Sequence, residues 1–151
     1  MAGWPLLAQR LKALLPGLWA GLLLTVAGLA TRAPFAVLSP ADAGRVVSRV
    51  LSHEAHVSLV LGALLLVLER FGTRRAASQG HGKQFTPAML LTLGALFCTV
   101  AGYFALQPLM AAAKAGQGAF SFGQLHALSA GLYLIKLALV LTLAWRATRQ
   151  S

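Results

Sequence analysis

Hydrophobic residues are distributed along the chain in four long stretches, which short polar or basic segments separate. The first of these stretches, Ala13 to Ala30, has Thr25 as its only polar side chain. An apolar run of about 18 residues or more is typical of a helix that crosses a membrane. We therefore predict an all-α, antiparallel four-helix transmembrane bundle that forms a single membrane domain over residues 1–151. Its spans are expected at about residues 13–31, 47–69, 87–111 and 122–145.

The second stretch, Ser39 to Arg75, differs from the others because only its later half is apolar. Ser39 and Pro40 stand where an N-cap and a first helical residue belong, so a helix is expected to begin here. Its apolar half, Val57 to Leu68, is too short to cross a bilayer, which needs about 20 residues. The helix can cross a membrane only if other helices shelter its polar half, which contains Arg45, Arg49, His53, Glu54 and His56.

Proline, glycine and hydroxyl residues mark the ends of the other helices. Pro34 is expected to interrupt the helix after the first span, and Pro108 is expected to kink the end of the third. Thr86 and Ser121 are the predicted N-caps of the third and fourth spans. The segment from Gly72 to Phe85 is expected to be a flexible basic loop without helical periodicity.

The composition agrees with a membrane protein, since 58% of the residues are hydrophobic and 11% are charged, against about 25% charged in soluble proteins. The net charge of +10 does not indicate nucleic-acid binding, because a solvated basic face would need polar neighbours that this chain lacks. The basic residues are instead divided unequally between the two sides of the predicted bundle. One side has Arg10, Lys12, Arg70, Arg74, Arg75, Lys83, Arg146 and Arg149, and the other has Arg32, Arg45, Arg49 and Lys114. This bias predicts a multi-pass protein with both termini and the central loop in the cytoplasm.

Polar side chains recur on one face of three of the predicted helices. Counting 1.5 Å of rise per residue from the cytoplasmic ends places most of them in the outer half of the membrane. A polar face is not stable against lipid. The outer half of the bundle is therefore predicted to enclose a polar-lined interior, a candidate site for a small ligand or ion. Its candidate residues are His53, His56, Tyr103, Gln107, His126, Ser129, Tyr133 and Lys136.

Three histidines offer a second interpretation of the same residues. His53 and His56 are three residues apart and share a helical face, where they are candidate ligands of a metal or haem that His126 or a tyrosine would complete. The segment HEAH differs in spacing from the HExxH motif of zinc proteases. Alternatively, these side chains satisfy one another in a hydrogen-bonded network, and we expect no cofactor. No nucleophile with a neighbouring base and orienting group is visible, so the sequence predicts no enzymatic activity.

Lys136 is expected near the middle of the bilayer, ten residues before Arg146, where a lysine costs roughly 3 kcal/mol on insertion scales. Counting along the helices places neither Glu54 nor Glu69 at the same depth. The amine is then either neutral or joined by an external anion. Its hydrogen-bond partners are expected among backbone carbonyls and the side chains of Thr25, Thr99 and Tyr133. On this basis Lys136→Leu should fold and insert at least as well as the wild type.

Two segments carry a family resemblance: PFAVLSPADAGRVV, residues 34–47, and GYFALQPLMAAAKAGQGAFSFGQLHALS, residues 102–129. They resemble the small bacterial membrane proteins with a transmembrane protein 205-like domain, and the likeness covers nearly the whole chain. The resemblance implies a four-helix protein of the bacterial inner membrane, in a family of unknown function without an assigned enzymatic activity. Leu51 stands where members commonly have an aromatic residue. The short Leu-His-x-x-Ser match carries over to His126 and Ser129, with no chemistry attached to it.

These observations predict a non-enzymatic inner-membrane protein of unassigned activity with a polar interior. Two alternatives stay open. One is a membrane haem or metal-binding redox protein that uses His53, His56 and His126; the other is a structural partner in a membrane complex. The expected partners are the lipid bilayer and either a second copy of the chain or another membrane protein, but not nucleic acid.

Overall fold

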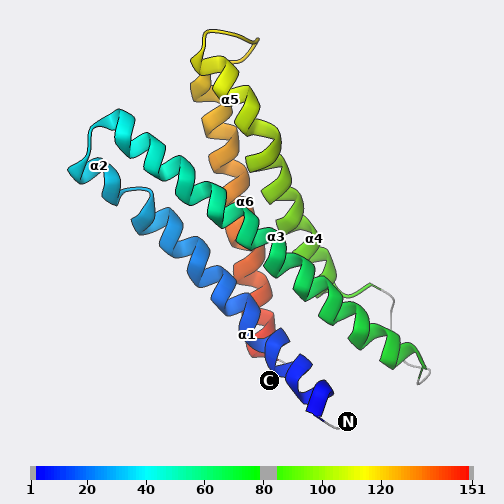
Figure 1. Cartoon of the computed structure of the whole chain (residues 1–151). Coiled ribbons are helices and arrows are strands. Elements are labelled where there is room, and N and C mark those ends of the chain that lie inside the picture. Colours follow the sequence, from blue (N-terminus) through cyan, green and yellow to red (C-terminus); the bar gives the residue numbers. More distant parts are fainter. Residues whose placement is uncertain (1–2, 79–84, 150–151) are drawn as a thin grey trace.

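The computed structural model describes residues 3–78 and 85–149, including the side chains of residues 6–74 and 85–149, and all regular secondary structure in these ranges is helical (Figure 1). The elements are α1 (Gly3–Thr25), the π-helix η1 (Val26–Ala30), α2 (Ala33–Val37), α3 (Pro40–Ser78), α4 (Pro87–Thr99), the π-helix η2 (Val100–Ala105), α5 (Leu106–Lys114) and α6 (Phe122–Thr148). Four helical segments are long and apolar enough to cross a membrane: Leu6–Val37, Pro40–Arg74, Pro87–Lys114 and Phe122–Thr148. The prediction of an all-helical fold with four helices able to cross a membrane is thus confirmed.

The predicted N-caps are present at the start of three helices. The side-chain oxygens of Ser39, Thr86 and Ser121 each accept a hydrogen bond from the backbone N–H three residues further on, at 3.2 Å in every case. At Ser121 the side chain of Gln124 also accepts from the backbone N–H of the cap, which completes a capping box. These bonds satisfy backbone donors that a helix leaves unpaired, so each helix begins where the sequence predicts.

The predicted loop after the second span begins later than expected. Gly72 lies inside α3, which continues to Ser78 and is 39 residues long. At 1.5 Å per residue this helix measures about 58 Å, nearly twice the thickness of the hydrocarbon core of a bilayer. Part of the predicted loop, residues 79–84 with Lys83, lies outside the described residues.

Two π-helices occur in the first and third spans, each beside a proline. η1 ends four residues before Pro34, and η2 ends three residues before Pro108. A proline lacks the N–H that would bond to the carbonyl four residues earlier, and its ring crowds that carbonyl. Beside Pro108 the chain passes directly from η2 into α5, whereas beside Pro34 a turn at Thr31 and Arg32 separates η1 from α2. The expected interruption at Pro34 therefore begins earlier, at Val26, and the helix resumes as α2.

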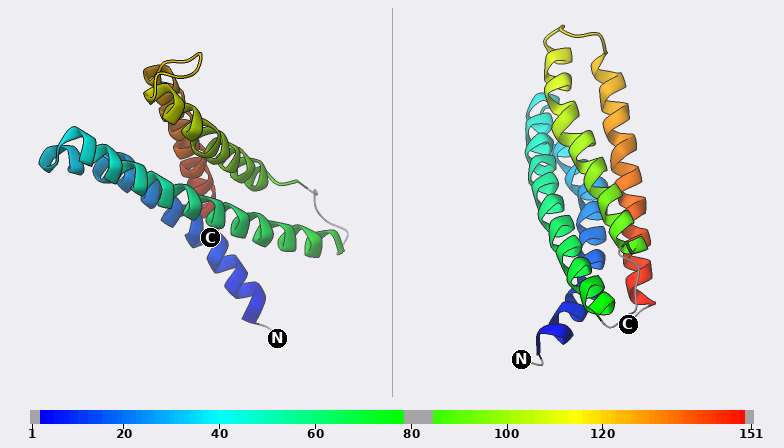
Figure 2. Two further views of the ribbon diagram at one scale, coloured as in Figure 1. Left: turned by 45° about the horizontal axis from the view of Figure 1, so that its top comes forward. Right: turned by 90° about the vertical axis from the view of Figure 1, so that its right-hand side faces the viewer.

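The four spans pack as a ring. In this ring α1 contacts α3 and α6, and α4 also contacts α3 and α6, whereas no Cα atom of α3 lies within 8 Å of α6. Both termini lie at one end of the molecule, called here the termini end, and the α2–α3 and α5–α6 connections lie at the other, called the turn end (Figure 1). The two halves of the ring, one formed by α1–α3 and the other by α4–α6, separate towards the turn end (Figures 1 and 2).

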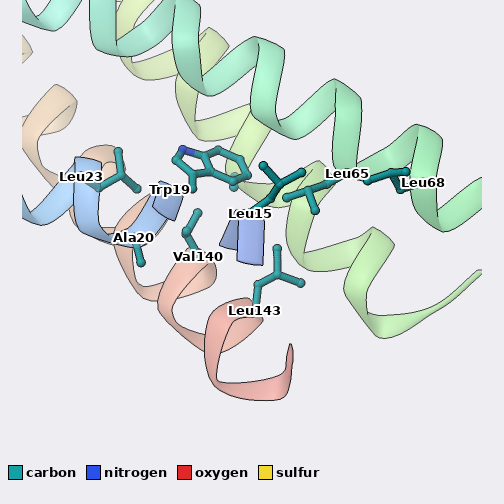
Figure 3. Packing of buried hydrophobic residues seen from close by; sticks show 9 residues of the cluster. Leu15, Trp19, Ala20, Leu23, Leu65, Leu68, Val140 and Leu143 are labelled. Carbon is teal, nitrogen blue, oxygen red and sulfur yellow. The ribbon is translucent and has the colours of Figure 1, made fainter. Parts of the chain in front are cut away.

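A buried apolar cluster holds the ring together near the termini end (Figure 3). Trp19 and Leu23 of α1 and Val140 of α6 are fully buried in it, with Leu65 of α3 beside them. Lipid is as apolar as these side chains, so their association depends on close packing rather than on escape from water. Gly62 allows that packing between α3 and α4, since a Cβ atom there would lie 2.5 Å from Leu96 Cδ2.

Candidate functional site

A buried ion pair lies inside the ring. Lys136 Nζ of α6 donates to both carboxylate oxygens of Glu54 on α3, at 2.8 and 3.0 Å. The side chains of Lys136 and Glu54 are only 4% and 3% exposed. Because α3 and α6 are not in backbone contact, the pair reaches diagonally across the interior and links two helices whose backbones lie apart.

Further hydrogen bonds extend this pair to a third helix. Ser58 Oγ donates to Glu54 Oε1, and Trp19 Nε1 of α1 donates to Ser58 Oγ at 2.9 Å. On the other side, Lys136 Nζ lies 4.5 Å from the centre of the Tyr133 ring, as in a cation–π contact. We call these five side chains the ion-pair network. No buried side-chain nitrogen or oxygen in the described part of the chain lacks a hydrogen-bond partner, so the cost of burying the charges is offset locally.

The expectation that no carboxylate reaches Lys136 is wrong. Depths counted along upright helices place Glu54 too far from Lys136, but α3 runs obliquely through the bundle (Figure 1). The four-carbon stem of a lysine then spans the remaining distance across the ring. Lys136→Leu is therefore no longer expected to fold as well as the wild type, because the substitution would leave the buried carboxylate of Glu54 without its cation.

The polar face of α6 also bonds to backbone carbonyls near both π-helices. Tyr133 Oη donates to the carbonyl of Leu23, three residues before η1, at 2.9 Å. Ser129 Oγ donates to the carbonyl of Gly102, inside η2, at 2.7 Å. Short π-helical segments frequently occur at functional sites. Here one face of α6 connects α1, α3 and η2, which makes it the organising element of the interior.

A polar cleft opens between α3 and the η2–α5 segment at the turn end. Its volume is about 550 Å³, and we call it the basic cleft. It is lined by Pro40, Ala41, Gly44, Arg45, Ser48, Arg49, Ser52, Tyr103 and Lys114. Arg45 forms a salt bridge with Asp42, whereas no described carboxylate pairs with Arg49 or Lys114. The cleft therefore combines an excess of positive charge with the hydroxyl groups of two serines and a tyrosine.

None of the three candidate histidines is among the residues that line the basic cleft. Nδ1 of His53 lies 2.8 Å from the carbonyl of Arg49, and Nδ1 of His56 lies 2.7 Å from that of Ser52. A carbonyl only accepts, so Nδ1 carries the proton in each ring, and Nε2 of the neutral ring is left as an acceptor. His126 is exposed and stacks on Phe122 of its own helix, with ring centres 5.7 Å apart. Within residues 3–78 and 85–149, no group of three or more His, Cys, Asp or Glu side chains is arranged to hold a metal ion.

The structure divides the predicted polar interior into three environments. The side chains of Ser129, Tyr133 and Lys136 bond inside the bundle. Tyr103 lines the basic cleft, and His56 meets the neighbouring Phe104 edge-on at 5.3 Å. The remaining residues are half-buried (Gln107) or exposed (His53 and His126).

Sequence reasoning missed three members of the ion-pair network: Trp19, Glu54 and Ser58. One signal was available for Glu54. It is the only acidic residue in the central part of a predicted span, and Lys136 is the only basic residue in such a position. Charges buried in a membrane usually pair with each other. For Trp19 and Ser58 no signal stands out among the similar residues of the apolar stretches.

The comparisons with known proteins place the chain in a family. The domain of unknown function DUF4149 matches residues 14–119, which is more than half of the chain. The chain belongs to the DUF4149 family. No curated protein and no solved structure gives a significant match.

The DUF4149 match covers the two parts of the site unequally. It contains Trp19, Glu54 and Ser58 together with the whole lining of the basic cleft. It ends before α6, so Tyr133 and Lys136 lie beyond the matched residues. The DUF4149 description assigns no activity, and the sequence prediction of a membrane protein from a family of unknown function is confirmed to that extent.

Proposed function

We propose that this DUF4149 protein is a non-enzymatic, multi-pass membrane protein that binds a small anionic ligand in the basic cleft. The observation that carries the proposal is the cleft itself, about 550 Å³ in volume, with Arg49 and Lys114 free of described carboxylates. Sites for small molecules typically measure about 300–1,000 Å³ and contain a few well-placed polar groups. The basic excess favours a carboxylate or phosphate over a neutral ligand or a cation.

The lining is arranged to recognise an anion by geometry as well as by charge. A guanidinium can bind a carboxylate or phosphate through two parallel hydrogen bonds, and Arg49 supplies such a group from one wall. Lys114 supplies a second positive charge from the opposite wall, at the end of α5. Ser48, Ser52 and Tyr103 add hydroxyl donors between them.

The charge bias supports a location of the cleft on the outer side of the membrane. With both termini in the cytoplasm, the turn end and its cleft face the outer side of the membrane. The resemblance to transmembrane protein 205-like proteins supports the bacterial inner membrane as the compartment. A ligand would then reach the cleft from the cell exterior or from the outer leaflet.

Binding of simple anions by purified protein in a neutral detergent would test the proposal. We expect inorganic phosphate or hexanoate, but not the neutral hexanol, to raise the melting temperature, and Arg49→Gln to weaken that binding at least tenfold. Arg74→Gln is the matched control, because Arg74 is exposed on the same helix and does not line the cleft. Anion binding that is absent from the wild type, or lost equally in both variants, would refute the proposal.

A further inference from the structure

A second hollow lies at the termini end, where all four spans contribute to its wall. Its volume is about 410 Å³, and we call it the termini-end vestibule. It is lined by Gln9, Arg10, Lys12, Ala13 and Pro16 of α1, Leu65 and Glu69 of α3, Ala88 and Thr92 of α4, and Leu143, Arg146 and Ala147 of α6. Its exposed lining residues are polar or basic, and its buried ones are apolar except for Thr92.

The charges around the vestibule leave a positive excess. Lys12 Nζ lies 2.7 Å from Glu69 Oε1, and Thr86 Oγ1, of the α4 N-cap, donates to Glu69 Oε2 at 3.3 Å. Both oxygens of the only acidic lining residue are therefore engaged. Arg10 and Arg146 enter from different helices, α1 and α6, and no described carboxylate pairs with either of them.

The depth of the vestibule matches a lipid headgroup. Its basic residues lie at the ends of spans, and the next turns of these spans are apolar. In a bilayer, such a boundary between basic and apolar residues lies at the level of the phosphate layer. Leu14 and Leu18 of α1 are 62% and 66% exposed just beyond it, so an acyl chain has an apolar surface to follow. Basic pockets between membrane helices are typical binding sites for anionic lipid headgroups.

We propose that the termini-end vestibule binds the phosphate group of an anionic membrane phospholipid, with Arg10 and Arg146 as the two guanidinium donors. The bound headgroup connects the first and last spans at the end where both termini lie. This inference does not depend on the proposed function of the basic cleft, which lies at the opposite end of the bundle.

The proposal is tested with the whole protein reconstituted in nanodiscs. The probes are phosphatidylcholine alone, phosphatidylcholine with one fifth phosphatidylglycerol, and phosphatidylcholine with inorganic phosphate in solution. We expect phosphatidylglycerol to be enriched among the lipids retained after gentle detergent extraction, and to raise the melting temperature. Inorganic phosphate should produce little of this stabilisation, because it lacks the apolar tail.

Two double variants separate a specific site from general surface charge. Arg10→Gln/Arg146→Gln should reduce the phosphatidylglycerol enrichment at least tenfold. Arg70→Gln/Arg74→Gln removes the same number of charges from exposed positions of α3 near the same end, outside the vestibule, and should leave the enrichment unchanged. Equal losses in both variants, no enrichment in the wild type, or full stabilisation by inorganic phosphate would overturn the proposal. Both variants should elute as the wild type does in size-exclusion chromatography.

Discussion

Removing one partner of the Glu54–Lys136 pair should destabilise the protein far more than removing both. In Lys136→Met the carboxylate of Glu54 keeps Ser58 as a donor but loses both bonds to the ammonium group. Its side chain is 3% exposed, so water cannot replace the cation. Breaking a buried pair in this way costs about 3–5 kcal/mol. A neutral hydrogen bond between membrane helices contributes only about 0.6 kcal/mol on average. An ion pair and a neutral hydrogen bond at this contact therefore predict clearly different losses of stability in Lys136→Met.

The double variant Glu54→Leu/Lys136→Met removes both charges and leaves apolar groups of similar size. Replacing a buried ion pair by apolar residues is often neutral or stabilising. We therefore expect the double variant to unfold within about 1 kcal/mol of the wild type, while each single variant loses about 3 kcal/mol or more. The two substitutions are then strongly non-additive, as expected for groups in direct contact.

Equilibrium unfolding by sodium dodecyl sulfate in mixed micelles would measure these free energies. Thr142→Val is the control on the same helix, because its exposed hydroxyl bonds only to the carbonyl of Ala138, and it should change the free energy of unfolding by less than about 0.5 kcal/mol. If each single variant stays within about 0.5 kcal/mol of the wild type, or if the double variant equals the sum of the two, the pair does not stabilise the bundle as described.

Two further predictions concern topology and cofactor content. In a Cys98→Ser background, an impermeant thiol reagent added outside intact cells should label Gln117→Cys but not Ser78→Cys, since the charge bias predicts that the termini end is inside; the reverse pattern would contradict this topology. Protein purified in mild detergent should show no visible absorption band and no stoichiometric metal. A band or bound metal that His56→Ala abolishes would instead support the redox alternative, because loss of a ligating nitrogen is not offset by packing.

Local features of this fold could be predicted from the sequence, and contacts between distant helices could not. The caps at Ser39, Thr86 and Ser121 depend on residues close together in the chain, and each was found where predicted. The partner of Lys136 depends on the tilt of α3 and on the order of helices around the ring, which residue spacing does not contain. Counting depth along upright helices therefore separated two residues that the fold brings together.

The candidate site shows the same difference between local features, which the sequence predicts, and long-range packing, which it does not. Ser129, Tyr133 and Lys136 were expected to line the interior, and the side chains of all three form hydrogen bonds inside the bundle. The polar half of α3 was also expected to face a closed interior, but Arg49 lines an open cleft and His53 is exposed. The difference arises because the two halves of the ring separate towards the turn end, a long-range property of the packing.

The two π-helices also determine where the chain tolerates a change in length. The hydrogen bond of a π-helix joins residues five apart, whereas that of an α-helix joins residues four apart. A π-turn therefore contains one residue more than an α-turn. Deleting one residue from Val26–Ala30 or Val100–Ala105 would therefore restore an ordinary α-turn there and leave the remainder of that span close to its present orientation, whereas a deletion in a regular α-helix rotates everything that follows by about 100°. The α6 helix is α-helical throughout and has no such spare residue. A deletion between Ser129 and Lys136 would turn one of these side chains away from its partner, so natural variation in length is expected in the first and third spans and not in the last.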